Sequence, residues 1–582
     1  MTVRRIWDLR RGDDDDNRMS PKQGGLRGMV LSAVLEFNFV HAAVLFLALI
    51  IGPALLLGIA PSVVVTYGRL MLQAMRMAGT SPVLGLVWLA AMVALALWAG
   101  RRVVTTVFDN FQHLHYTLVF PLFVALREFL RVIAERLLGR SITPQRLNRG
   151  RRISAVVAAL LFAAGGLALA LAVERSFGFQ ILDVLRAHPW ALAKESLGNA
   201  AIILGLSTAL ASLYWLWREL TLSGPVLDWA PASSNPEAPA VRIAHLSDLH
   251  LVGERYGYRM EAGTHGPRGN RRILRVFRKL AAIDAVTPLD RIFVTGDITD
   301  AGTRAEWTAF IDLLRGSPEV RSRLSFVPGN HDVNTVDRTN AARLDLPWSS
   351  SQALRKLRVV LALDMIQGDR AHVVDRASGR LGPTLSDYLR QGKRMERLRA
   401  LAARGAARGR WEMERVWESI FPLVEPAGAT HRCGVILLNS NARTHFSLTN
   451  AIGFISPPEL RALKAILLSS PGCPWIIALH HQIVEYPVPS IALHDRVGLA
   501  LVNASDVLAA IEPYASRTLV LHGHRHWDWI GTCGGVVLCS AASASLGSQT
   551  GGKRVGSFRV HDLAINAHGD TCLIKTENIK VA

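Results

Sequence analysis

The sequence predicts two structural classes in one chain of 582 residues: an all-α membrane region of about four helices, followed by an α/β domain. The chain is too long for one domain. Half of its residues are hydrophobic, and they concentrate before about residue 220, which predicts a membrane region followed by a soluble one. From Val241 onward, short β-rich runs alternate with helical stretches such as 272–282 and 304–314. This alternation is typical of layered α/β domains.

Four apolar segments are long enough to span a bilayer, which takes about 20 helical residues. They lie within a membrane region of residues 29–217 and cover residues 39–65, 82–100, 153–173 and 199–217. None of them has the polar face that a helix of a soluble bundle would show. Pro53 and Pro61 lie in the first segment, which predicts a kink or an early end there.

The loop charges predict the orientation of these spans. Residues 101–152 carry ten arginines against three acidic residues, whereas loops 66–81 and 174–198 carry few net charges. The positive-inside rule therefore predicts a multi-pass protein of the inner membrane, with everything after residue 217 in the cytoplasm. Residues 116–138 begin apolar and then add charges, so we expect a helix lying in the membrane interface. As a fifth span, this segment would move the C-terminal domain to the outside.

Three other segments differ in composition from the predicted domains. Residues 1–28 are polar, which predicts a disordered cytoplasmic tail. Residues 218–240 contain four prolines and read as a linker, after which residues 241–582 form the α/β domain. Within that domain, residues 335–430 are rich in arginine and in helix-forming residues. So long a gap between consecutive strands predicts a helical insertion over the site.

Charge and cysteine content limit the classes of partner. The net charge is +20, but the basic residues are mostly arginines without interleaved aromatic residues, and the positive-inside rule accounts for many of them. We therefore expect membrane lipids as partners and no nucleic acid. The five cysteines are odd in number and unclustered, which predicts free thiols in a reducing compartment.

Polar residues follow five of the predicted strands. In the central stretch, residues 327–332, an apolar run ends at Pro328-Gly329 and is followed by Asn330, His331 and Asp332. The other four strand ends carry Asp248 and His250, Asp297, His480, and His524 and His526. Ligands are usual at the carboxyl ends of strands in α/β sheets. Oxygen and imidazole groups suit divalent Zn, Mn or Fe, and two such ions can clamp a phosphoryl group.

The order of these motifs resembles that of the calcineurin-like metallophosphoesterases. The residues around the motifs most resemble the bacterial branch of that family, which contains cyclic-nucleotide phosphodiesterases. The motifs are Asp248-Leu249-His250, Gly296-Asp297, Gly329-Asn330-His331-Asp332, His480 and Gly523-His524-Arg525-His526. One of them alone would be weak, but five in the family's order are specific. The resemblance covers residues 241–582, and it implies a four-layer α/β/β/α sandwich of two mixed sheets.

The resemblance also implies a role for each motif residue. One divalent ion would be held by Asp248, His250 and His526, a second by Asn330, His480 and His524, and Asp297 would bridge them. A metal-bridging hydroxide would attack phosphorus, His331 would protonate the leaving oxygen, and Asp332 would orient His331. Only one of His480 and His481 can face the site from a strand end, and we expect His480. Asn330 and Arg525 are candidate substrate contacts, although Arg525 also fits a solvated loop residue.

Three functions are compatible with these residues. The first is a membrane-anchored phosphohydrolase, with two metal ions, that cleaves a soluble phosphodiester such as a cyclic nucleotide. The second is a pyrophosphatase or phosphodiesterase for a lipid-linked substrate, which the basic loop 101–152 and the interfacial helix favour. The third is a non-catalytic membrane sensor or scaffold, which a lost ligand or a missing His331 would signal. Neither loss is seen in this sequence.

Overall fold

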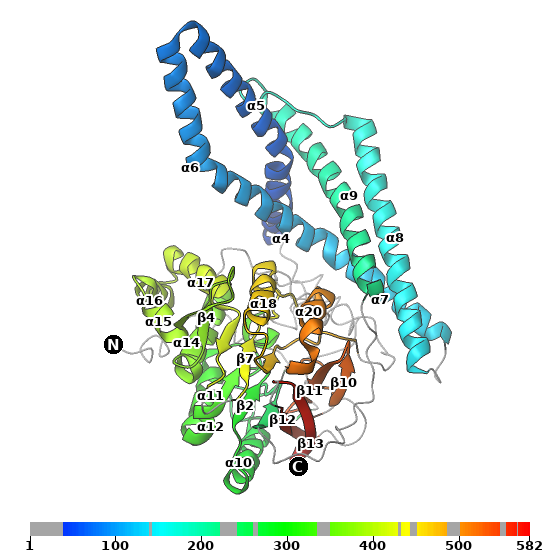
Figure 1. Cartoon of the computed structure of the whole chain (residues 1–582), viewed down its shortest axis with the longest axis vertical. Coiled ribbons are helices and arrows are strands. Elements are labelled where there is room, and N and C mark those ends of the chain that lie inside the picture. Colours follow the sequence, from blue (N-terminus) through cyan, green and yellow to red (C-terminus); the bar gives the residue numbers. More distant parts are fainter. Residues whose placement is uncertain are drawn as a thin grey trace. The chain divides into compact units, whose positions relative to one another are not determined.

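The computed structural model describes residues 39–138, 143–221, 241–259, 266–334, 350–428, 432–442, 451–485, 501–547, 555–566 and 569–581. These residues form two compact units, a helical unit of Phe39–Thr221 and an α/β unit that begins at Val241 (Figure 1). The predicted tail, residues 1–28, and most of the predicted linker, residues 218–240, lie outside the described residues.

The helical unit contains four helical runs that are long and apolar enough to cross a membrane: Ala42–Thr80, Pro82–Leu137, Gln145–Phe177 and Pro189–Thr221. This confirms the prediction of about four such helices. The first run does not end at its prolines, because α5 continues past Pro61 to Thr80. The elements are α4 (Phe39–Phe46), the π-helix η1 (Leu47–Ile51), α5 (Gly52–Thr80), α6 (Pro82–Leu114), the π-helix η2 (His115–Val119), α7 (Phe120–Leu138), α8 (Pro144–Phe177) and α9 (Pro189–Thr221).

Glycine allows α8 and α9 to pack closely. A Cβ atom on Gly166 would lie 2.6 Å from the carbonyl oxygen of Gly205, and a Cβ atom on Gly205 would lie 2.6 Å from that of Gly166. Close backbone approach at small residues is a common way for membrane helices to associate, because lipid supplies little hydrophobic drive between them.

Helix α7, the segment expected to lie in the membrane interface, continues α6 through the π-helix η2. Most of its acidic side chains and one of its arginines face other helices, and the interfacial position stays a prediction. Glu128, Arg131 and Glu135 are buried, while Phe129 and Leu137 are exposed. The buried charges are paired with α8 and α9: Arg151 Nε lies 2.8 Å from Glu135 Oε1, and Arg131 Nη2 lies 2.9 Å from Glu219 Oε1. Hydropathy could not reveal this, because it does not show which face of a helix packs on a neighbour.

The α/β unit is built on two mixed sheets, which confirms the predicted fold class. The first sheet has the strand order β13-β12-β1-β2-β3, and the second β10-β11-β9-β8-β7-β6-β4-β5. In the first, β1, β2 and β3 are parallel; in the second, β7, β8, β9 and β11 are parallel. The bounds are β1 (Val241–Leu246), β2 (Arg291–Val294), β3 (Leu324–Phe326), β4 (His372–Val374), β5 (Leu381–Thr384), β6 (Leu423–Glu425), β7 (Gly434–Leu437), β8 (Trp475–Ala478), β9 (Thr518–His522), β10 (Trp529–Cys533), β11 (Val536–Ser540), β12 (Gly556–Ile565) and β13 (Thr571–Val581).

Alternate side chains of the second sheet face two different cores. In β8, Ile476 and Ala478 join the core shared with the first sheet, whereas Trp475 and Ile477 join a second core. Helices α18 (Pro457–Ser469) and α20 (Ala504–Ile511) close this second core. Because successive side chains of a strand point to opposite faces, both faces of this sheet must be covered.

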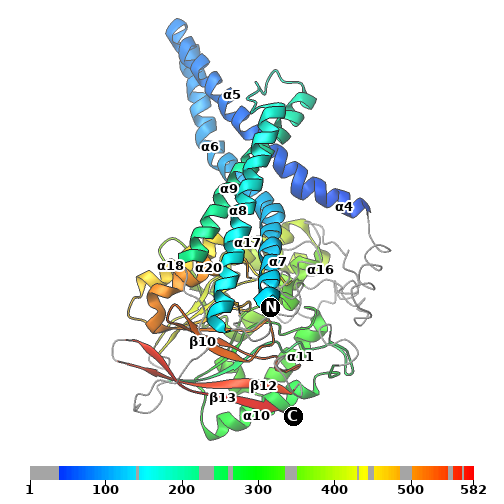
Figure 2. The same cartoon turned by 90° about the vertical axis from the view of Figure 1, so that its right-hand side faces the viewer.

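Helices on both outer faces complete the four layers. Helix α10 (Arg271–Val286) packs on β12 and β13, with its apolar side in the core of the first sheet. Figure 2 shows the order α10, then β12 and β13, then β10, then α18 and α20. On the first sheet's side, α11 (Arg304–Arg315) begins with a capping box formed by Thr303 and Glu306, and α12 (Pro318–Arg323) follows it.

The segment expected to be a helical insertion, residues 335–430, is not purely helical. It contains α14 (Ser350–Gln367), α15 (Leu385–Arg390), α16 (Arg394–Arg404) and α17 (Ala407–Ile420), and also the short strands β4, β5 and β6. These strands extend one edge of the second sheet. Helix α14 is buried along most of its length and belongs to the main core. The segment is therefore part of the sandwich as well as an addition to it.

Candidate metal centre

The ends of five strands meet at the candidate site. Strands β1, β2 and β3 are parallel neighbours in the first sheet, and β8 and β9 are parallel neighbours in the second. Parallel neighbours end at the same edge of a sheet, so the loops that follow them come together. The structure brings all seven predicted ligands together there, each of them buried: Asp248, His250, Asp297, Asn330, His480, His524 and His526.

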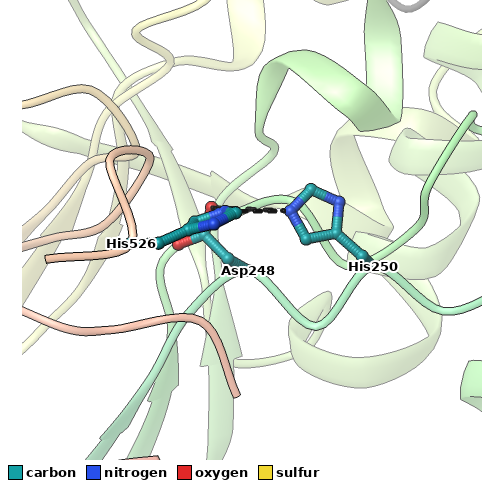
Figure 3. Close-up of side chains that lie close together, drawn as sticks. All are labelled: Asp248, His250 and His526. Atoms are coloured by element: carbon teal, nitrogen blue, oxygen red, sulfur yellow. Dashed lines mark hydrogen bonds and ion pairs between the residues drawn. The ribbon is translucent and has the colours of Figure 1, made fainter. Parts of the chain in front are cut away.

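Asp248, His250 and His526 form one group of potential ligands (Figure 3). Nε2 of His250 and Nε2 of His526 lie 3.2 Å apart, and Nε2 of His526 lies 3.3 Å from Oδ1 of Asp248. The two rings are nearly perpendicular, with their nitrogen edges directed at the same space. Three potential metal-ligating atoms, on loops that follow strands of both sheets, therefore converge on one point.

A second group is formed by Asp297, His480 and His524. Nε2 of His480 lies 3.3 Å from Oδ2 of Asp297, 3.1 Å from Nδ1 of His524 and 3.1 Å from Oδ1 of Asn330. The same Asp297 oxygen lies 3.9 Å from Nε2 of His250, which belongs to the first group. Asp297 thus stands between the two groups.

Five of the seven predicted ligands have a left-handed backbone conformation. Among the described residues, the non-glycine residues with positive φ are Asp248, His250, Asp297, His524 and His526, with φ between 44° and 74°. Such residues are uncommon and cost of order 1–3 kcal/mol each, and they cluster at functional sites. Backbone bonds hold the turns: the Asp248 N–H donates to the Gly296 carbonyl, and the His250 N–H donates to the Asp297 carbonyl.

Three glycines leave space for the ligands. A Cβ atom on Gly329 would lie 2.1 Å from Oδ1 of Asp297, and one on Gly523 would lie 2.5 Å from Oδ2 of Asp248. A Cβ atom on Gly296, whose φ is +93°, would lie 2.4 Å from Nδ1 of His480. Gly329 itself has φ −100°, which any residue adopts. Glycine is therefore needed at position 329 for close packing against Asp297.

The carboxylates dominate the electrostatics of the site. Burial alone would lower the pKa of His250, but three surrounding carboxylates outweigh it and raise this pKa to about 9. Burial is outweighed in the same way at His480, whose pKa is also raised to about 9, mainly by Asp297. Burial would raise the pKa of Asp297, but the neighbouring imidazoles, His480 first, hold it well below its usual range. A bound cation would take the place of these imidazole protons, because metal ligation needs neutral histidine.

His331 is positioned by a backbone group. Its Nδ1 lies 2.7 Å from the carbonyl oxygen of Asp300, and its Nε2 lies 4.0 Å from Oδ2 of Asp297. An imidazole that donates from Nδ1 to a carbonyl presents Nε2 to the site. The ring also packs edge-on against His250, with centroids 4.5 Å apart.

The structure gives Asp332 partners other than the expected one. Its carboxylate accepts hydrogen bonds from the backbone N–H groups of Gly329, Ile298 and Thr299 and from the Thr299 hydroxyl. Asp332 thus joins the loop after β3 to the loop after β2. The contact that orients the Nδ1 of His331 comes from the Asp300 carbonyl instead, so the orienting role expected of Asp332 is corrected.

His481 and Arg525 have other partners close to the site. Nδ1 of His481 lies 2.8 Å from the Ser440 hydroxyl, while the neighbouring His480 points at Asp297. This geometry favours His480 as the ligand. Nη1 of Arg525 lies 3.4 Å from Oε2 of Glu485, so the charge of this candidate substrate contact is partly neutralised.

Sequence reasoning missed three residues that support the ligand loops. Oδ1 of the buried Asp300 lies 3.4 Å from Nδ1 of His250, on the side of the ring away from the site. From the insertion helix α14, Arg355 donates to the Val333 carbonyl and Arg358 donates to the Gly302 carbonyl. Asp300 could have been found from its place in the Gly-Asp-Ile-Thr-Asp run, but the arginines carry no motif.

The donor set fits bound divalent metal. Oδ1 of Asp248 is buried and accepts no hydrogen bond from any residue that the structure describes. The converging atoms are imidazole nitrogens and carboxylate or amide oxygens, which suit Mn, Fe or Zn. The outer ring nitrogens of His250 and His480 have oxygen partners, the usual arrangement behind metal-bound histidines.

Residues 241–528 match the profile of the calcineurin-like phosphoesterases. This part of the chain belongs to that family. Over 103 residues, 18% of its length, this chain is 31% identical to a Coxiella burnetii protein described as a "probable cyclic nucleotide phosphodiesterase". The chain spans only 36% of the length of that relative.

A solved structure also resembles part of this chain. It is that of a dimetal phosphatase from Danio rerio, with 13% sequence identity and a TM-score of 0.34. The likeness covers 59% of this chain and 100% of the zebrafish chain.

Proposed function

We propose that this chain is a membrane-anchored phosphodiesterase that works with two divalent metal ions. One ion would be bound by Asp248, His250 and His526, the other by Asn330, His480 and His524, with Asp297 bridging them. The observation that carries the proposal is the left-handed backbone at five of these buried ligands, on loops that follow strands of both sheets. Backbone strain gathered at converging charged groups is typical of a functional site. The match to a relative described as a phosphodiesterase supports a diester substrate.

The chain's own residues would position the substrate and move one proton. When bound, the two ions would activate a water molecule and neutralise charge on the phosphoryl group. The Asp300 carbonyl holds the Nδ1 proton of His331, so the exchangeable proton is the one on Nε2, beside Asp297. From that position His331 would protonate the leaving oxygen as a general acid. The ligand loops are braced by Asp332 and by the arginines of α14.

Hydrolysis of an aryl phosphodiester by the full-length chain in detergent tests this proposal. We expect exhaustive chelation to abolish turnover and added Mn²⁺, Fe²⁺ or Zn²⁺ to restore it. The variant Asp297→Asn removes the bridging carboxylate, so we expect it to bind less metal and to lose activity at any metal concentration. Asp312→Asn is the matched control, because this aspartate is exposed on α11 and should leave the rate unchanged.

Undiminished turnover after chelation and in Asp297→Asn would overturn the proposal. If turnover does depend on metal, a panel on the same preparation would compare the rates for cyclic nucleotides and for lipid-linked pyrophosphates, and so identify the substrate class. Faster hydrolysis of the cyclic nucleotides would support a soluble diester, and faster hydrolysis of the lipid pyrophosphates would replace it with a membrane substrate.

A further inference from the structure

Helices α16 and α17 form a strongly basic hairpin. They pack side by side at the outer edge of the α/β unit, next to β4 (Figure 1). Helix α16 ends at Gly405, which has φ +62°, and α17 begins two residues later. Residues 393–415 contain eight lysines and arginines against three glutamates. The excess of positive charge therefore belongs to an ordered structure rather than to a loose tail.

The inward side of the hairpin is firmly packed, and its acids are paired. Met413, Val416 and Ile420 of α17 are fully buried in the main core. Glu412 forms an ion pair with Arg397, whose Nη1 lies 2.6 Å from Oε2 of the glutamate. Glu414 forms an ion pair with Lys356 of α14, whose Nζ lies 2.7 Å from Oε2 of the glutamate. Two of the three glutamates are thus neutralised within the fold, and the outward side keeps its positive charge.

The outward side of the hairpin carries three exposed arginines and one exposed tryptophan. Arg408, Trp411 and Arg415 are exposed at helical spacing on α17, and Arg404 is exposed at the end of α16. Within the part of the chain that the structure describes, none of these three arginines forms an ion pair. Trp411 is 72% exposed, and the other highly exposed tryptophans among the described residues belong to the helical unit. An exposed tryptophan beside exposed arginines is the combination that surfaces in contact with a membrane interface use.

We propose that this outward face, defined by Arg404, Arg408, Trp411 and Arg415, docks on the anionic headgroups of the bilayer. Tryptophan prefers the membrane–water interface, and clustered arginines are attracted by anionic lipid. The 19 residues between α9 and β1 can span at most about 65 Å, which tethers the α/β unit to the helical unit and keeps a bilayer crossed by that unit within reach. Single-stranded nucleic acid is a poorer fit, because successive bases need several stacked aromatic side chains and this face has one.

A spin label at the start of α17 tests the docking. The full-length chain with Ala407→Cys, an exposed position, would carry a nitroxide in nanodiscs of phosphatidylcholine, with or without 30% phosphatidylglycerol. Unsubstituted chain, treated identically, corrects for the native cysteines. We expect phosphatidylglycerol to make the label less accessible to a water-soluble nickel complex and more accessible to oxygen. The triple variant Arg404→Glu, Arg408→Glu, Arg415→Glu should shift the docking equilibrium by roughly 10²-fold and cancel that change.

Matched variants separate this face from general attraction by net charge. Arg271→Glu, Arg275→Glu, Arg278→Glu reverses the same number of exposed charges on α10 and should leave the label's accessibility unchanged. Trp411→Ala should keep the dependence on anionic lipid and weaken the shielding. The proposal is overturned if the α10 variant acts as strongly as the α17 variant, if phosphatidylglycerol has no effect, or if added single-stranded RNA shields the label where anionic lipid does not.

Discussion

At the residue scale, the cost of the left-handed ligands must be met by the loops around them. Each such residue costs of order 1–3 kcal/mol and persists only where its surroundings over-determine it. Here the backbone of one ligand loop bonds to the next: the His524 N–H donates to Oδ2 of Asp248, and the His331 N–H donates to Oδ1 of Asp297. The carboxylates that would bind metal are therefore also the acceptors that shape the loops.

The sequence predicts which residues gather at the site but not what holds them. Asp248, His250 and the other predicted ligands are recognisable because each stands within a few residues of the end of an apolar run. The partner of His331 is a backbone carbonyl, and every residue has one, so no residue type marks it. The role of Gly329 is also hidden in the sequence. The sequence suggests a turn there, whereas the structure shows that the absence of a side chain makes room for Asp297.

At this scale we predict that His331→Ala slows the hydrolysis of substrates with poor leaving groups more than that of substrates with good ones. If His331 Nε2 donates a proton to the leaving oxygen, then loss of this donor matters most for a poor leaving group. We expect turnover of alkyl phosphodiesters to fall by about 10² or more, and that of p-nitrophenyl diesters by less than about tenfold. Metal content by elemental analysis should stay as in the wild type. His188→Ala, which changes an exposed histidine of the helical unit, serves as control. Equal slowing for both kinds of leaving group would argue against the acid role.

At the scale of elements, the insertion shows why helix-forming sequence can hide strands. Strands β4, β5 and β6 are three or four residues long, too short for a period-2 pattern to stand out among arginine-rich helices. Helix α14 is buried nearly all round, so it lacks the polar stripe of a surface helix. Its arginines reach carbonyls beside the ligand loops, which places part of the insertion directly behind the site.

Helix α18 carries a buried glutamate whose charge is unfavourable. Ser456 caps this helix, and Oε1 of Glu459 accepts a 2.7 Å hydrogen bond from the Asn439 N–H after β7. Burial raises the pKa of Glu459 from 4.5 to about 8, against the smaller effects of that bond and of Arg376. Between these two values the unfolded chain ionises this carboxyl and the folded chain keeps it protonated. The folded state therefore binds more protons, and the contribution of Glu459 to stability falls as pH rises from 4.5 to 8.

We therefore predict that Glu459→Gln stabilises the protein at alkaline pH. A neutral amide keeps an oxygen for the Asn439 N–H and removes the cost of burying a charge. We expect the variant to unfold at a higher temperature than the wild type at pH 8, by an amount equivalent to about 2 kcal/mol, with the gap closing near pH 5. Thermal melts across this pH range measure it. The exposed Glu319→Gln should show no such trend, and a constant gap for Glu459→Gln at all pH values would contradict the assigned cause.

At the scale of the whole molecule, composition alone separates a helical unit from an α/β unit, because apolar length and strand–helix alternation are properties of long stretches. Four helices of sufficient length and apolarity follow from hydropathy, and they are present. The inward orientation of Glu128, Arg131 and Glu135 does not follow, because it depends on Arg151 and Glu219, which lie on other helices. Contacts between distant segments are what a local pattern leaves out.

The buried charges of α7 bear on the topology. Charged side chains inside a membrane bundle pair with one another, so α7 could lie along the bundle's end or cross the bilayer, and only the second would change the side of the C-terminal unit. The ten arginines of residues 101–152 favour keeping this whole segment on the cytoplasmic side. We predict that green fluorescent protein fused after Ala582 fluoresces and that alkaline phosphatase fused there is inactive. The same reporters on chains ended at Arg186 should give the opposite pair, since loop 174–198 is expected outside. Active phosphatase after Ala582 would mean that α7 is a fifth span, with its ion pairs sealed inside the membrane.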